Sequence, residues 1–139
     1  ADPINLGRII RLSAGFGADG VLISAGRADP FSRQALRVSM GASLALPVLV
    51  ADSFAAQLRR LRETDNCQIA ASVLDPHAKP LRDYPRPGRL VLLFGSEAHG
   101  LPAEIRALCD VELTIPMSGG VDSFNVADAC GIFLYELCR

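Results

Sequence analysis

Short apolar runs alternate with amphipathic stretches along this chain. Strands with almost no polar residue are typical of a parallel sheet that is covered on both faces. The alternation therefore predicts an α/β domain with a mainly parallel sheet flanked by helices. The predicted strands are Val21–Ser24, Pro47–Ala51, Gln68–Val73, Leu90–Phe94 and Val111–Ile115.

The amphipathic stretches between these runs predict helices, because apolar residues recur there at the spacing of one helix face. Four prolines interrupt the pattern between Asp75 and Arg89, so we expect a surface loop in that segment. A linker between two domains is the alternative. The predicted helices are Asn5–Phe16, Ser32–Leu44, Ser53–Glu63, Pro102–Leu108 and a last helix from about Ser123.

Length and composition indicate a single domain with a real core. The 139 residues are 50% hydrophobic and 21% charged, which argues against disorder. The net charge is -1, so an overall basic field for nucleic acid is absent, while a local basic patch stays open. No apolar run approaches the roughly 20 residues that span a bilayer, and we find no signal peptide. We therefore expect no contact with a membrane.

The cysteines of the chain include no C-x-x-C pair. No zinc or redox motif is therefore predicted, and no other spacing of His, Cys and carboxylates indicates a metal. We expect reduced thiols buried among apolar residues, in a cytosol-like compartment. The cysteines are Cys67, Cys109, Cys130 and Cys138.

Two loops that follow predicted strands carry candidate chemistry, because ligands of parallel α/β sheets bind beyond the carboxyl ends of the strands. In the segment Leu92–Pro102, two glycines, Gly95 and Gly100, flank Glu97. Glycine allows close approach of a ligand or a positive φ. The simplest role for Glu97 is to cap the helix that follows.

The second loop runs through the segment Ile115–Val126. A Gly-Gly pair precedes a predicted helix start that Asp122 or Ser123 would cap. Exposed backbone N–H and C=O groups in such a loop suit a small heterocycle. A plain loop before a capped helix is the alternative.

The predicted first helix carries two arginines, Arg8 and Arg11, on the side opposite its apolar face. Two arginines in this arrangement suit a phosphate group. Solvated surface charges are the alternative.

Three segments of the chain match three recognisable motifs, in the same order. In the first, Asp2–Arg11, an asparagine at position 5 precedes an arginine six residues later. The second is Phe94–Leu101 and the third is Ile115–Ala127. Together they resemble the motifs of the SpoU/TrmH family of RNA 2′-O-ribose methyltransferases, within the SPOUT superfamily. The resemblance spans essentially the whole chain.

The chain departs from the family pattern at four positions. Phe124 stands where leucine is usual, Asp128 and Cys130 replace small or apolar residues, and Arg8 is an additional charge. None of these departures removes a residue that the chemistry of the family needs.

The resemblance implies a fold that periodicity does not reveal. Residues 1–139 would form a catalytic domain with a deep C-terminal trefoil knot, made by the segments from about Leu90 onward. Family members often carry an N-terminal RNA-binding extension, which we expect this chain to lack. The resemblance further implies a cytoplasmic homodimer with its active site at the subunit interface.

The activity implied by the resemblance is methyl transfer from S-adenosylmethionine to a ribose 2′-hydroxyl of structured RNA, either rRNA or tRNA. Arg11 would hold an RNA phosphate and position the 2′-hydroxyl, and no metal is implied. The implied catalytic residues are Asn5, Arg11, Glu97, Ser123 and Asn125. The implied cofactor-binding residues are Ser72, Leu93, Gly95, Ile115, Met117 and Phe124.

Three other interpretations remain at this stage. The first is a relative that binds RNA and has lost catalysis, which the presence of all five implied catalytic residues disfavours. The second is an unknotted, flavodoxin-like nucleotide-binding domain, which the absence of G-x-G-x-x-G and P-loop motifs disfavours. The third is a relative that methylates a base.

Overall fold

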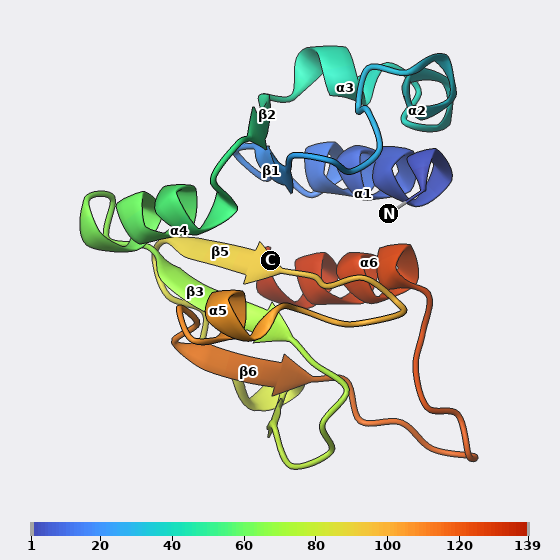
Figure 1. Cartoon of the computed structure of the whole chain (residues 1–139). Helices are drawn as coiled ribbons and strands as arrows, with labels where there is room; N and C mark the ends of the chain where they lie inside the picture. Colours follow the sequence, from blue (N-terminus) through green and yellow to red (C-terminus); the bar gives the residue numbers. More distant parts are fainter. Residues whose placement is uncertain (1, 139) are drawn as a thin grey trace. The chain divides into compact units, whose positions relative to one another are not determined.

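The computed structural model describes residues 2–138 and confirms the α/β class, with helices and strands alternating along the chain (Figure 1). The chain divides into two compact units. The first unit is Ala1–Phe54 with Ala127–Arg139, and the second unit is Ala55–Val126.

All five predicted strands are present, each within one residue of its predicted bounds, and every pairing is parallel. β1 pairs with β2 in the first unit, while the second unit holds a four-stranded sheet in the order β4-β6-β3-β5. The five are β1 (Val21–Ser24), β2 (Val48–Ala51), β3 (Gln68–Ser72), β5 (Leu90–Leu93) and β6 (Val111–Thr114).

We expected the proline-containing segment 75–89 to be an irregular surface loop, but part of it is regular. It contains the short strand β4 (Lys79–Pro80) and a 3₁₀ helix, η1 (Leu81–Asp83). β4 lies at the edge of its sheet, where a proline without an N–H is tolerated. A two-residue pairing has no periodicity that the sequence alone reveals.

Four of the predicted helices form: α1 (Pro3–Gly15), α4 (Phe54–Glu63), α5 (Ala103–Arg106) and α6 (Val126–Leu137). The prediction of one helix over Ser32–Leu44 is wrong. The structure has two helices there, α2 (Arg33–Val38) and α3 (Ala42–Ala45), because Met40 and Gly41 adopt φ values of 53° and 81°. A left-handed backbone at both positions ends the right-handed helix.

The core of the first unit forms between α1 and the β1–β2 pair. The Asp2 carboxylate caps α1 by accepting the Asn5 N–H at 2.7 Å. Leu6 and Ile10 then pack with Ile23. A Cβ on Gly7 would lie 2.9–3.0 Å from Val38 and Ala35 of α2, so only glycine permits this close packing of α1 on α2.

Helix α6 completes the first unit. It buries one face, and the ring of its Tyr135 meets Phe16 edge to face at 6.2 Å. Leu12 of α1 lies against Gly131, where an added Cβ would be 3.5 Å from the leucine methyls. The buried residues of α6 are Ala127, Cys130, Phe133, Leu134 and Leu137.

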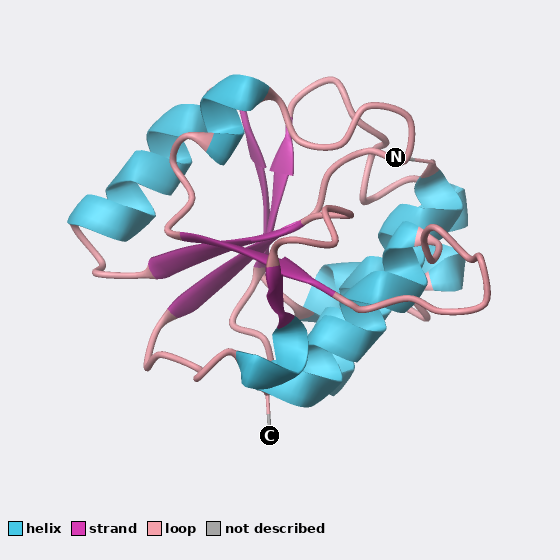
Figure 2. Ribbon diagram, turned by 90° about the horizontal axis from the view of Figure 1, so that it is seen from below, coloured by secondary structure: helices cyan, strands magenta, loops and turns pink. Residues whose placement is uncertain are grey.

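The second unit is built around β3, the strand between β5 and β6. Ile69, Ala70 and Ala71 of this strand are fully buried, as is Leu58 of α4. The arrows of β3, β5 and β6 point the same way (Figure 1), so their carboxyl ends share one edge of the sheet. Irregular loops, pink in Figure 2, continue from these ends.

All four thiols are free, but only Cys130 is buried. The expectation that all four are buried is wrong for Cys67, Cys109 and Cys138, which are half-buried at the ends of elements. Within residues 2–138 no helix has the length and apolar character needed to cross a bilayer. The same residues contain no group of three or more His, Cys, Asp or Glu suited to a metal ion.

Candidate functional site

The carboxyl edge of the four-stranded sheet carries both loops that the sequence singled out. Residues 94–101 follow β5, and residues 115–125 follow β6 and lead to α6 as a long extended segment (Figure 1). Parallel α/β sheets bind ligands at this edge. The two loops therefore form the candidate site of the second unit.

The loop after β5 folds tightly back on itself. The Gly100 N–H donates to the Ser96 carbonyl oxygen at 2.8 Å, and the His99 N–H donates to the Ser96 hydroxyl at 3.1 Å. A Cβ on Gly95 would lie 2.3 Å from the Gly100 carbonyl carbon and 2.5 Å from the Leu101 nitrogen. Gly95 is therefore needed for the loop to close, a reason that sequence reasoning did not supply.

Glu97 joins the two loops. Its Oε1 accepts the Asn125 Nδ2–H at 3.2 Å and the backbone N–H of Val126, the first residue of α6, at 3.4 Å. A carboxylate is favourable at a helix N-terminus, where the N–H groups lack partners in the helix. The structure thus brings together two predicted catalytic residues, Glu97 and Asn125.

The structure contradicts the simpler, purely structural role of Glu97. It does not cap the helix that follows, α5, whose N-cap residue, Pro102, has no side-chain cap. It contacts α6 instead, a helix that begins 29 residues later.

The prediction that α6 starts near Ser123 with Asp122 or Ser123 as its cap is also wrong, since the helix begins at Val126. The intervening segment stays irregular after Gly119 and Gly120, which adopt φ values of 68° and 74°. Ser123 is exposed in this segment.

The six predicted cofactor-binding residues all belong to the second unit. Ser72 and Leu93 end the neighbouring strands β3 and β5, and Ile115 directly follows β6. The chain direction therefore places these three with Gly95 at the same edge of one sheet. Met117 is half-buried, and Phe124 is 44% exposed in the loop that precedes α6.

The other two predicted catalytic residues, Asn5 and Arg11, lie on α1 of the first unit. Asn5 is buried, with 8% of its surface exposed, and Arg11 is exposed. No ion pair within residues 2–138 involves Arg11. Its guanidinium is thus available to an anionic ligand, since an arginine stays protonated.

Arg8 differs from Arg11, although the sequence predicts that the two arginines act as one pair. The Arg8 guanidinium forms an ion pair with the Asp128 carboxylate of α6. Only Arg11 of the two therefore keeps a charge that no described carboxylate balances.

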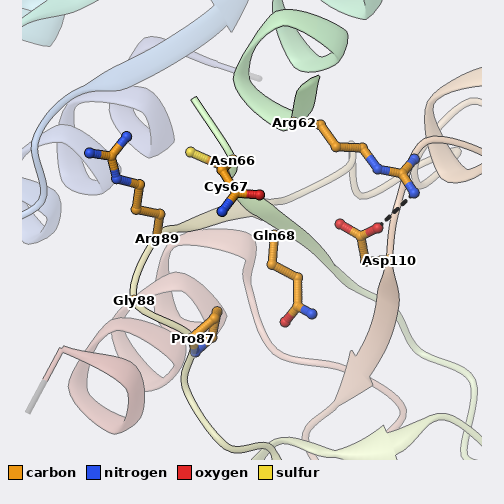
Figure 3. A pocket seen from close by; sticks show the side chains of 8 residues that line it. All are labelled: Arg62, Asn66, Cys67, Gln68, Pro87, Gly88, Arg89 and Asp110. Carbon is orange, nitrogen blue, oxygen red and sulfur yellow. Dashed lines mark ion pairs between the residues drawn. The ribbon is translucent and has the colours of Figure 1, made fainter. Parts of the chain in front are cut away.

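A pocket of about 580 Å³ opens at the opposite, amino edge of the four-stranded sheet. Arg62 and Asp110 form an ion pair of 2.8 Å on one side of it, and Arg89 lies on the other side (Figure 3). Because it lies at the amino ends of the strands, this pocket is not the predicted cofactor site. Its lining residues are Arg62, Asn66, Cys67, Gln68, Pro87, Gly88, Arg89 and Asp110.

A hydrogen bond ties the segment after η1 to this edge, where the Tyr84 hydroxyl donates to Gln68 Oε1. Burial and the nearby Asp110 carboxylate raise the pKa of Tyr84. The phenol therefore remains a neutral donor throughout the neutral pH range.

The sequence profile of the SpoU rRNA Methylase family matches residues 1–135. A protein of Mycobacterium bovis described as an uncharacterized tRNA/rRNA methyltransferase is 38% identical over 144 residues, which cover 99% of this chain and 49% of that protein. The 23S rRNA (guanosine-2′-O-)-methyltransferase RlmB of Acinetobacter baylyi is 31% identical over 138 residues, covering 99% of this chain and 56% of the enzyme.

Solved structures share the fold over almost the whole length of this chain. The AdoMet-bound rRNA methyltransferase of Sinorhizobium meliloti superposes with a TM-score of 0.89 at 34% identity, covering 98% of this chain and 51% of that one. The chain thus spans about half the length of the curated relatives that it matches.

Proposed function

The chain belongs to the SpoU rRNA Methylase family, and from this premise we propose that it transfers a methyl group from S-adenosylmethionine to a ribose 2′-hydroxyl of rRNA or tRNA. One observation carries the proposal. Glu97 of the second motif holds Asn125 of the third motif at the ligand-binding edge of the sheet. The Mycobacterium bovis and Acinetobacter baylyi relatives are RNA methyltransferases by name, the second a 23S rRNA (guanosine-2′-O-)-methyltransferase.

The residues at this edge suit S-adenosylmethionine. The segment 115–125 is irregular, so its backbone N–H and C=O groups are not committed to a helix or a sheet. Phe124, with 44% of its surface exposed, and Met117 offer apolar contacts of the kind that an adenine ring needs. Ser72, Leu93, Gly95 and Ile115 complete the proposed cofactor-binding set. When bound, the sulfonium supplies an electrophilic methyl group.

Arg11 is the residue to which we assign the substrate side of the reaction. A protonated guanidinium is a poor base and a good bidentate partner for phosphate. We therefore assign to it the clamping of an RNA phosphate next to the reacting ribose, with the phosphate oxygen accepting the 2′-hydroxyl proton. With S-adenosylmethionine held at the sheet edge, its methyl group would pass to the 2′-oxygen that Arg11 positions, and S-adenosylhomocysteine would be the product.

The remaining catalytic residues position the reactants in this proposal. Glu97 fixes Asn125 and the start of α6, which sets the end of the loop that carries Ser123. Asn5 lies six residues before Arg11 on α1 and is buried. Orientation of this kind lowers a barrier without any charge transfer to the protein.

The same proposal includes the architecture of the family. We propose that the segments from about Leu90 onward form a trefoil knot and that two copies of the chain build each active site. We also propose a cytoplasmic location.

Calorimetric titration with S-adenosylhomocysteine, followed by mass spectrometry of RNA incubated with enzyme and S-adenosylmethionine, tests the proposal. We expect stoichiometric binding and a mass gain of one methyl group on a ribose. A folded protein that does not bind S-adenosylhomocysteine would refute the function. Binding without transfer to either rRNA or tRNA would favour the relative that has lost catalysis.

A further inference from the structure

The segment from Ser24 to Ala51 concentrates positive charge in a chain whose net charge is -1. It contains three arginines, Arg27, Arg33 and Arg37, and Asp29 as its single acidic residue. All three arginines are exposed, and no ion pair within residues 2–138 involves them. The Asp29 carboxylate accepts a backbone N–H, that of Phe31, at 2.9 Å.

The arginines of α2 are not explained by the stability of that helix. Arg33 is its first residue, next to the positive end of the helix dipole, where a cation is unfavourable. Arg37 lies four residues later on the same face, and like charges at this spacing repel each other. Only the position of Arg37 in the last turn favours the helix. An anionic ligand would relieve both unfavourable terms.

Phe31 gives the same segment an exposed aromatic ring. Its backbone is held by the bond to Asp29, between the buried Pro30 and Ser32, whose hydroxyl caps α2 at 3.1 Å. An apolar residue before the N-cap often packs on the fourth residue of the helix, here Leu36. Even so, 46% of Phe31 remains exposed, which leaves ring surface open.

Arg27 extends the charge along the loop between β1 and α2 (Figure 1). Its Nε–H donates to the Ser24 hydroxyl at the end of β1, at 3.3 Å, which orients the guanidinium while leaving its terminal nitrogens to solvent. The loop thus presents an exposed aromatic residue between two arginines in sequence, Arg27 and Arg33.

We propose that Arg27, Phe31, Arg33 and Arg37 form a contact surface for an unpaired stretch of the RNA substrate. One base would stack on the Phe31 ring while the arginines pair with neighbouring phosphates. Proteins that hold single-stranded RNA combine stacking aromatic rings with basic side chains in this way. Three like charges and one engaged carboxylate favour a polyanion over a protein surface of mixed charge. The inference rests on the proposed function, because it supplies that reaction with its RNA.

Affinity for a short single-stranded RNA, compared with a duplex of the same length, tests this surface. Phe31→Leu keeps an apolar side chain before the N-cap and removes the ring, and Phe31→Trp restores stacking. We expect Phe31→Leu to weaken single-strand binding by about 5- to 100-fold and Phe31→Trp to rescue it, with little effect on the duplex.

The arginines are tested by the salt dependence of the same binding. Arg33→Ala combined with Arg37→Ala should reduce the slope of log affinity against log salt by about 0.7 for each phosphate contact that is lost. Arg59→Ala, an exposed arginine of α4, is the matched control and should leave the slope unchanged.

Titration of each variant with S-adenosylhomocysteine and measurement of its mass in solution separate the possible failures. Normal cofactor binding with unchanged RNA affinity in Phe31→Leu would overturn the inference and leave the proposed function intact. A change of oligomeric state in these variants would overturn it as well, in favour of a contact between copies. Failure of the unmodified protein to bind S-adenosylhomocysteine would refute the proposed function itself.

Discussion

Arg8 of α1 and Asp128 of α6, 120 positions apart in the chain, form an ion pair within the first unit. Both residues depart from the family pattern. Their pairing shows that the two departures compensate each other, since each supplies the partner of the other. The pair also separates Arg8 from Arg11, whose charge remains available.

The Arg8–Asp128 pair should contribute little to stability, because its side chains are 40% and 52% exposed. We expect a coupling of about 0.2–1 kcal/mol in a double-mutant cycle of Arg8→Ala and Asp128→Ala, weakening with added salt. Urea unfolding of the four proteins measures it. A coupling that does not respond to salt would show that the two residues interact through packing instead.

Glu97→Ala should impair methyl transfer by about 10²-fold, because the loss of both its hydrogen bonds lets Asn125 and the start of α6 shift. Glu97→Gln keeps an acceptor oxygen and should retain more activity. Glu104→Ala, an exposed glutamate of α5, serves as the control. Single-turnover rates with saturating S-adenosylmethionine give the comparison. Equal rates for Glu97→Ala and the control would show that Glu97 does not contribute to methyl transfer.

Asn125 is tested from the other side of the same contact. In Asn125→Asp, the new carboxylate faces the Glu97 carboxylate, so repulsion replaces a hydrogen bond. We expect Asn125→Asp to transfer methyl groups more slowly than Asn125→Ala in single-turnover measurements. Equal rates for the two variants would count against contact between the two side chains.

The strands were predictable because they are nearly free of polar residues, and in β3 burial explains this, since Ile69, Ala70 and Ala71 are fully buried. The ends of helices were less predictable. The left-handed backbone at Met40 is unusual for a residue other than glycine, so Gly41 was the residue that could signal the break between α2 and α3.

The candidate site was also predictable only in part. The two loops could be placed at the carboxyl edge from the order of strands and helices alone. The contact of Glu97 with α6 could not, because a helix start is judged from the residues just before it, and this carboxylate comes from 29 positions away. The collision that forbids a side chain at Gly95 also depends on a backbone contact that appears only in three dimensions.

Arg11→Ala should abolish methyl transfer while leaving the affinity for S-adenosylhomocysteine unchanged, because the proposed role of Arg11 is to hold RNA phosphate. We expect a loss of about 10²-fold or more in rate, with partial recovery in Arg11→Lys, which keeps the charge without the bidentate geometry. Arg59→Ala is the control for the loss of one exposed positive charge. Normal turnover by Arg11→Ala would eliminate the proposed role.

Stability should fall as pH rises above 9.0, because burial and the neighbouring Cys138 raise the pKa of Cys130 from 9.0 to about 12. The unfolded thiol loses its proton first, so the folded state is favoured fully below pH 9.0 and this contribution disappears between pH 9.0 and about 12. Cys109 and Tyr84, whose pKa values are also raised, act in the same direction.

Urea unfolding at several pH values measures this effect. Cys130→Ala should reduce the alkaline loss of stability, although it lowers stability at neutral pH by leaving a small cavity. Cys67→Ala is the control, as that thiol is only half-buried. An identical alkaline slope in Cys130→Ala and in the unmodified protein would show that Cys130 does not contribute.

Gly95→Ala should disrupt the loop after β5 even when no ligand is bound. Its Cβ would lie 2.3 Å from the Gly100 carbonyl carbon, a backbone atom that no side-chain rotation can move away. We expect a loss of about 1–3 kcal/mol in stability, as for other overpacked sites, together with loss of S-adenosylhomocysteine binding.

Gly88→Ala is the matched control for Gly95→Ala, because nothing lies within 4 Å of an added Cβ there. It should be neutral or stabilising by up to about 1 kcal/mol, since alanine restricts the unfolded chain. Thermal unfolding and calorimetry on both variants give the comparison. If Gly95→Ala binds S-adenosylhomocysteine as tightly as Gly88→Ala does, the cofactor does not depend on the closed form of this loop, and the proposed binding edge must be abandoned.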